Sequence, residues 1–111
     1  MGRNMKMNDY QTAAKGTAIY PQEQGLIYTV LGLCGESGEV AEKVKKMIRD
    51  GDDKSGNFED DLGAELGDVL WYLANLASEL GFTLEDIARS NLHKLQYRKS
   101  RGVIRGSGDN R

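Results

Sequence analysis

Apolar residues recur every three or four positions over two long stretches of this chain, and this spacing fixes most of its architecture. The stretches run from about Gln24 to Arg49 and from about Phe58 to Leu80. Residues spaced in this way share one face of an α-helix. Because the polar connection between them is short, the two helices are predicted to pack as an antiparallel hairpin. The stripes predicted to face each other are Leu26, Val30, Leu33, Val40, Val44 and Met47, and Leu62, Leu66, Val69, Leu73, Leu76 and Leu80.

A shorter helix is predicted on each side of the hairpin. Asn8 can cap a first helix that continues to about Thr17, before the turn at Tyr20-Pro21. Thr83 can cap a last helix that fades near Arg101. The predicted fold class is therefore all-α, an antiparallel helical hairpin plus flanking helices.

The length of 111 residues suits a single domain over residues 1–111. Residues 102–111 are expected to form a flexible tail unless something orders them. No apolar run approaches the roughly 20 residues that span a bilayer, and the N-terminus lacks the apolar stretch of a signal peptide. The single cysteine, Cys34, cannot form an internal disulfide and suits a reducing compartment. We therefore expect a cytoplasmic protein without a membrane partner.

The charge of the chain is unevenly distributed. A net charge of −2 argues against a protein held on duplex nucleic acid by phosphate contacts. Residues 36–86 hold 14 of the 17 acids, whereas the segment from Arg89 onward holds seven Lys or Arg against one acid. This asymmetry suits a metal and a phosphate held side by side, and it equally suits two oppositely charged solvated faces.

Five glycines lie inside the two long predicted helices. Each costs about 1 kcal/mol relative to alanine in a helix interior, so close packing must compensate for them. On the first helix Cys34, Gly38 and Ala41 share a second face. The second helix has a matching face, made by Gly63, Gly67, Ala74 and Ala77. Two packing faces per helix predict more neighbours than one chain provides, and hence a homo-oligomer, a homodimer or homotetramer with a four-helix-bundle core.

Two acidic pairs, Glu36 with Glu39 and Glu65 with Asp68, flank the predicted stripes in the same sense. At ~100° per residue, the first acid of each pair lies about 60° from its stripe and the second about 120°. In an antiparallel hairpin both pairs then open on one side. Both cross-pairs are symmetric about position 52, so Glu36 should face Asp68 and Glu39 should face Glu65.

Four carboxylates in this arrangement repel one another unless a proton or cation intervenes. Two unit charges ~5 Å apart interact by about 3 kcal/mol at an effective dielectric of 20. Oxygen ligands favour magnesium, manganese or calcium over zinc, and magnesium is usual where phosphates complete the shell. The alternative for either pair alone is a set of solvated surface acids.

The segments 31–49 and 65–101 resemble the MazG-like members of the all-α nucleoside triphosphate pyrophosphohydrolases. That family has E-x-x-E followed by E-x-x-D, and both halves are present here with 25 residues between them. The resemblance implies Mg²⁺-dependent cleavage (Mn²⁺ as a substitute) between the α and β phosphates of a nucleoside triphosphate, which releases a monophosphate and pyrophosphate. It also implies dimers or tetramers. The residues that match the acidic motif, as metal ligands and catalytic residues, are Glu36, Glu39, Glu65 and Asp68.

Asn91, Lys94 and Arg98 lie on one face of the last predicted helix, at helical spacing. They can be a buried amide with two surface cations, or a set that holds phosphate oxygens. The resemblance favours phosphate binding. Further candidate substrate contacts are Tyr72, one turn after Asp68, Tyr20, as a base-stacking residue, and Lys43, one turn after Glu39.

Two other functions stay open from the sequence. Phosphoribosyl-ATP pyrophosphohydrolysis would use the same metal motif, so only substrate profiling separates it from nucleoside triphosphate hydrolysis. A non-catalytic helical interaction module would carry the acids for solubility alone. A thermal response to magnesium would distinguish this last function from an enzyme.

Overall fold

The computed structural model describes residues 4–51 and 56–109, and all regular structure in these ranges is helical. Part of the predicted loop, at 52–55, and the two ends of the chain lie outside them. The helices are α1 (Met7–Gly16), the short 3-10 turn η1 (Gln22–Gln24), α2 (Gly25–Asp50), α3 (Phe58–Leu80) and α4 (Leu84–Ser100). The prediction of an all-α chain is confirmed. The bounds of α2 and α3 also agree with the periodicity, because the polar connection separates two continuous helical patterns.

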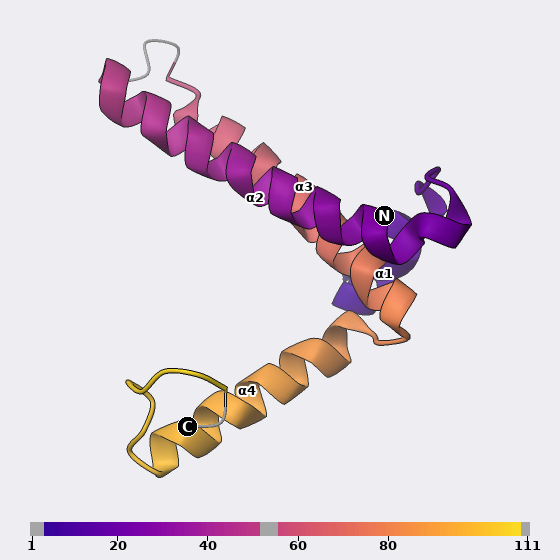
Figure 1. Cartoon of the computed structure of the whole chain (residues 1–111), viewed down its shortest axis with the longest axis vertical. Coiled ribbons are helices and arrows are strands. Elements are labelled where there is room, and N and C mark those ends of the chain that lie inside the picture. The colour runs from indigo at the N-terminus through magenta and orange to yellow at the C-terminus, as the bar shows by residue number, and fades with distance from the viewer. Residues whose placement is uncertain (1–3, 52–55, 110–111) are drawn as a thin grey trace.

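Helices α2 and α3 form the long arm seen in Figure 1, and two close approaches define their register. The ring of Tyr72 lies where a side chain of Gly32 would be, and the carboxyl group of Glu79 occupies the same position at Gly25. These contacts run antiparallel and are symmetric about position 52, as predicted for the acidic pairs. A glycine at position 32 is therefore required for the helices to approach this closely.

The interface between α2 and α3 lies on a different line of each helix from the predicted stripes. Leu33, Val40 and Met47 are half-buried on α2, but Leu26, Val30 and Val44 are exposed. On α3, Leu66 and Leu80 are likewise exposed. Because Tyr72 packs onto Gly32, the contact line of α2 passes through small and polar residues. Between the half-buried apolar side chains it includes Thr29, Gly32, Glu36 and Lys43.

The small apolar core lies where α1 crosses the α4-proximal end of α3. Its fully buried members are Ala14 of α1, Ala74 and Ala77 of α3 and Leu84 of α4. Trp71 packs against them, and its indole N–H donates a 2.7 Å hydrogen bond to Thr17 Oγ1. Half of the second face predicted on α3 is thus covered within one chain.

Asn8 does not cap its own helix, which corrects the sequence prediction. Helix α1 begins at Met7, two residues earlier than a helix capped by Asn8 would, and its N-cap position is Lys6. The side chain of Asn8 points to the start of α4, where its Oδ1 accepts a hydrogen bond from the backbone N–H of Glu85. Gln11 Oε1 accepts from the N–H of Leu84 beside it. The unpaired N–H groups at the start of a helix need such acceptors, so α1 fixes the start of α4.

Helix α4 begins as the sequence predicts but leaves the hairpin. Gly81 adopts the left-handed conformation (φ 80°) that ends α3, and Thr83 Oγ1 accepts from the N–H of Asp86. The helix then runs away from the α2–α3 arm (Figure 1) and has no close backbone approach to α2 in the described part of the chain. Only its first turns contact α1 and α3.

Four of the interior glycines face open space. A side chain at Gly35, Gly38, Gly63 or Gly67 would meet no atom within 4 Å among the described residues. Cys34 and Ala41, on the same face of α2 as Gly38, are exposed as well. Among the described residues of one chain, no packing contact therefore compensates for these glycines.

Candidate metal centre

Three of the four predicted ligands come together midway along the α2–α3 arm. Glu36 of α2 and Glu65 and Asp68 of α3 each offer a carboxylate oxygen, and these oxygens lie within 4.8 Å of one another. Glu36 and Glu65 are half-buried because they lie on the contact line of the two helices, whereas Asp68 is exposed at its edge. The group opens to solvent on the Asp68 side. Three converging carboxylates form a donor set suited to a hard divalent cation.

The charges of this cluster act most strongly on Glu36. Partial burial raises the pKa of Glu36, and the negative charges of Asp68 and Glu65 raise it further. A hydrogen bond with Glu65 favours the protonated form of Glu36, and the charge of Glu39 adds to the repulsion. A cation bound among these oxygens would favour the ionised form instead. The residues present thus fit a divalent ion.

Glu39 lies outside the three-carboxylate group. It is exposed, and it contributes to the cluster only through its charge on Glu36. Lys43, one turn further along α2, places its Nζ 3.9 Å from Glu65 Oε1. Residues three apart differ by about 60° in direction on a helix. Glu39 therefore lies beside the contact line that carries Glu36.

Tyr72 borders the acidic cluster, as its position in the sequence predicts. Burial is the largest of the effects that raise the pKa of Tyr72. A hydrogen bond with Tyr28 and the charges of Tyr28, Glu36 and Asp68 raise it further. Its ring packs edge-on against Trp71, with centroids 5.0 Å apart. Tyr72 is therefore held at one end of the site by aromatic neighbours.

Tyr20 is already stacked within the protein. Its ring lies 4.8 Å from that of Tyr28 in a nearly parallel arrangement, and the edge of Trp71 approaches it at 6.3 Å. Tyr28 thus covers one face of the Tyr20 ring, and base stacking by Tyr20 stays a prediction. Its hydroxyl donates a 3.4 Å hydrogen bond to Glu79 Oε2.

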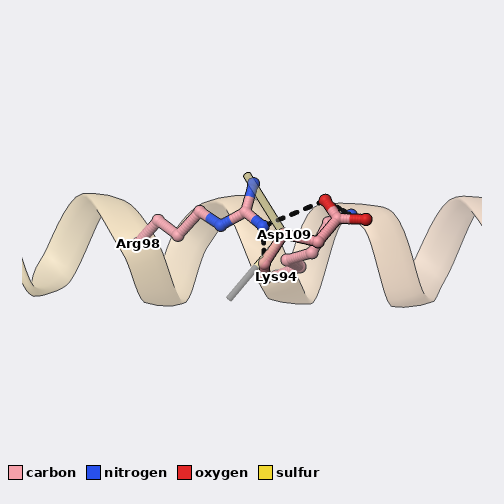
Figure 2. A network of polar contacts seen from close by, with 3 residues as sticks. All are labelled: Lys94, Arg98 and Asp109. Carbon is pink, nitrogen blue, oxygen red and sulfur yellow. Dashed lines mark hydrogen bonds and ion pairs between the residues drawn. The ribbon is translucent and has the colours of Figure 1, made fainter. Parts of the chain in front are cut away.

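The predicted phosphate-binding residues lie on α4, away from the acids of the same chain. Arg98 is almost fully buried, with 5% of its side chain exposed, and its Nη2 donates to the backbone oxygen and Oδ1 of Asp109. Lys94 Nζ also donates to Asp109 Oδ1, at 3.1 Å (Figure 2). Asn91 is exposed rather than buried on an apolar face, because α4 has left the hairpin at this point. The tail residue Asp109 thus occupies the cation pair.

Changing Asp109 to asparagine is expected to free Lys94 and Arg98 for an external anion. Hydrogen bonds from Lys94 and then Arg98 hold the pKa of Asp109 below its usual value, so it is ionised at neutral pH. Because Asp109 itself is exposed, its charge competes only weakly, and pyrophosphate should bind a few-fold more tightly without it. Titration calorimetry with inorganic pyrophosphate measures this. Asp109→Glu keeps the charge and should bind like wild type; equal affinity in all three proteins would contradict the prediction.

The family model described as the MazG nucleotide pyrophosphohydrolase domain matches residues 24–103, which include α2, α3 and α4. The chain belongs to this family. The resemblance inferred from the acidic motifs is thereby confirmed. The chain is also similar to the Gene 37 protein of Mycobacterium phage L5, with 53% identity over 114 residues that cover 96% of this chain and 100% of the phage protein. No solved structure matches the chain significantly.

Among the described residues of this MazG chain, no helix has the length and apolar character needed to cross a membrane. The two long helices, α2 and α3, carry charged residues along their length. Because the family is one of nucleotide pyrophosphohydrolases, the acids on these helices are the first candidates for metal-binding residues.

Proposed function

We propose that this chain is a Mg²⁺-dependent nucleoside triphosphate pyrophosphohydrolase, which converts a (deoxy)nucleoside triphosphate to the monophosphate and pyrophosphate. The observation that carries the proposal is the convergence of Glu36, Glu65 and Asp68 within 4.8 Å in a chain of the MazG family. Acids that only solvate the surface would not be expected to converge across two helices, because their mutual repulsion raises the pKa of Glu36. A site that binds a cation explains the convergence.

Each residue of the cluster has a role in this proposal. Glu36, Glu65 and Asp68 hold Mg²⁺, and the exposed Glu39 completes the set from the solvent side. When bound, Mg²⁺ supplies charge neutralisation for the phosphates and a more acidic water. Water attacks the α-phosphorus, the bond to the bridging oxygen of pyrophosphate breaks, and a carboxylate of the set accepts the proton of the water. The aromatic edge at Tyr72 limits access of bulk solvent on one side.

Lys94 and Arg98 are suited to the departing pyrophosphate. Arg98 can make two parallel hydrogen bonds to phosphate oxygens and Lys94 contributes a point charge, which stabilises the developing negative charge. Asn91 adds an amide on the same face of α4. These groups do not reach the acids of their own chain, since α4 diverges from the hairpin (Figure 1). The proposal therefore requires α4 of a second chain.

We infer a homodimer or homotetramer from the same geometry. The described part of one chain makes no compensating contact with the open faces at Gly35, Gly38, Gly63 and Gly67, and each glycine costs about 1 kcal/mol in a helix. Packing of two hairpins through these faces would create a four-helix core. Light scattering on a sizing column should give a mass of two or four chains at micromolar concentration. A mass of 12.3 kDa, that of one chain, would overturn the inference.

A product assay over a nucleotide panel tests the proposed reaction. The chain is incubated with each (deoxy)nucleoside triphosphate and with phosphoribosyl-ATP, in magnesium or in EDTA, and products are resolved by phosphorus NMR. We expect monophosphate and pyrophosphate in magnesium alone. Turnover of phosphoribosyl-ATP but of no triphosphate would reassign the substrate. Release of orthophosphate with formation of a nucleoside diphosphate would overturn the proposed activity. The absence of turnover with every compound would overturn it too.

A further inference from the structure

A polar hollow of about 520 Å³ lies beside α3, beyond the aromatic residues that border the acidic cluster. The end of α1, the segment before α2 and the last turns of α3 enclose it. The residues whose chemistry matters here are Lys15, Tyr20, Asn75, Ser78 and Glu79. None of the metal ligands contributes to it, so it is a separate feature of the molecule.

The hollow and the acidic cluster are aligned on one row of α3. Asp68, Tyr72, Asn75 and Glu79 follow one another at spacings of four, three and four residues, so they share a helix face. At 1.5 Å per residue, Asn75 lies about 10 Å along the axis from Asp68. This separation is on the scale of a nucleoside monophosphate. The hollow thus lies at the distance from the acids at which the base of a nucleotide would be found if its phosphates reached them.

Asn75 gives the hollow a buried and incompletely paired amide. The residue is 1% exposed, and its Nδ2 donates one hydrogen bond, to the backbone oxygen of Trp71 at 3.1 Å. In the described part of the chain its Oδ1 and second amide proton make no further hydrogen bond, yet no fully buried side-chain polar atom there lacks a partner. The small surface that Asn75 retains thus faces the hollow.

Glu79 adds a fixed acceptor one turn away. Its carboxyl group lies against Gly25, in the space that a side chain there would take, and accepts the long hydrogen bond from Tyr20. The negative charge of Glu79 also raises the pKa of Tyr20, after the larger effect of burial. Tyr20 therefore holds Glu79 in place while most of the carboxylate's hydrogen-bonding capacity stays available. An amide and a carboxylate side by side match a planar ligand with adjacent donors and acceptors.

We propose that this hollow binds the nucleobase of the substrate, with Asn75 and Glu79 reading its hydrogen-bonding edge. The inference rests on the proposed function for the identity of the ligand. Glu79 accepts a hydrogen bond from an exocyclic amino group or a ring N–H, and Asn75 offers one donor and one acceptor. Base selectivity of this chain is thus set on α3, seven and eleven residues after Asp68.

Glu79→Gln and Asn75→Ser test the assignment, with Glu59→Gln as the matched control. Glu59 is an exposed carboxylate on the same helix, at its other end. The measurement is kcat/KM for pyrophosphate release from each nucleoside triphosphate. We expect Glu79→Gln and Asn75→Ser each to change the ratio between the best nucleotide and the next by at least about tenfold, since a hydrogen bond to a charged or buried group is lost. Glu59→Gln should leave the ratio unchanged.

A second measurement keeps the test independent of turnover. Saturation-transfer NMR with bare nucleosides and no metal should show base protons in contact with wild type and Glu59→Gln, and weaker contact with Glu79→Gln. An equal loss of kcat/KM for every nucleotide, or unchanged ratios together with unchanged nucleoside contacts, would overturn the base site. Failure of every triphosphate to react would count against the proposed activity instead, and the nucleoside spectra would still decide the role of the hollow.

Discussion

Replacing Glu36 with glutamine is expected to lower kcat/KM for pyrophosphate release by at least about 100-fold. The oxygens of Glu36 lie within 4.8 Å of those of Glu65 and Asp68, so Glu36 is the ligand that α2 adds to the two carboxylates of α3. Glutamine keeps the size of the side chain and its hydrogen bond to Glu65 but removes the charge. Groups that only orient metal ligands already contribute 10–100-fold, so loss of a ligand should exceed that range.

The matched control is Glu42→Gln on the same helix. Glu42 is exposed and pairs only with Lys45 among the described residues, 2.9 Å away, so its loss should leave the rate within about twofold of wild type because exposed pairs contribute little. Wild-type turnover by Glu36→Gln would show that the cluster is not the reaction centre. Glu39→Gln examines the outlying acid: an unchanged rate would remove Glu39 from the proposed set.

Millimolar magnesium is expected to raise the melting temperature of the wild-type protein by roughly 10–20 °C. A ligand at 100 times its Kd stabilises the folded state by about 2.7 kcal/mol, and 1 kcal/mol shifts Tm by about 4–8 °C in a domain of this size. Glu36→Gln should melt above wild type without metal, because it relieves the repulsion with Asp68 and Glu65, and should respond less to magnesium. Differential scanning calorimetry measures both effects.

The stability of the metal-free protein is expected to depend on pH through the same repulsion between Glu36 and its neighbouring acids. Because the folded-state pKa of Glu36 is raised, the folded state binds the proton more tightly than the unfolded state. Stability therefore falls as pH rises from the ordinary glutamate pKa of 4.5 through the raised value, and stays lower above it. Glu36→Gln should lack this contribution. In the magnesium experiment, sodium chloride at matched ionic strength is the control. An equal rise of the melting temperature with magnesium in both proteins would contradict a metal site at Glu36.

The course of the hairpin could be predicted from sequence because it depends on local signals. Helix α3 runs from Phe58 to Leu80 as its periodicity indicates, and Gly81 ends it in the left-handed conformation. The line of contact was less predictable. A hydrophobic stripe defines a broad face, and which residues of that face touch the partner depends on side-chain size across the interface. Here Tyr72 fills the space left by Gly32, which leaves Leu26 and Val30 exposed.

The candidate site shows the same division. Charge, spacing and antiparallel register sufficed to bring Glu36 to Asp68. Glu39 lies about 60° around α2 from Glu36, on the side away from Leu33 and Val40, and is exposed. Asn75 was missed, although an amide among the leucines and alanines of α3 is the signal that could have found it. The course of α4 depends on hydrogen bonds that Asn8 and Gln11 accept from its first backbone N–H groups. These two residues are some 75 residues away in sequence, and no local pattern reports the contacts.

The divergence of α4 from the hairpin has a kinetic consequence. If Lys94 and Arg98 act on the same triphosphate as Glu36 and Asp68, the two groups belong to different chains, because α4 does not return to α2 within one chain. Turnover per chain should then fall on dilution below the dissociation constant of the assembly. Equal amounts of Glu36→Gln and Arg98→Ala protein, each inactive alone, should regain activity after subunit exchange, since some mixed assemblies contain one intact site.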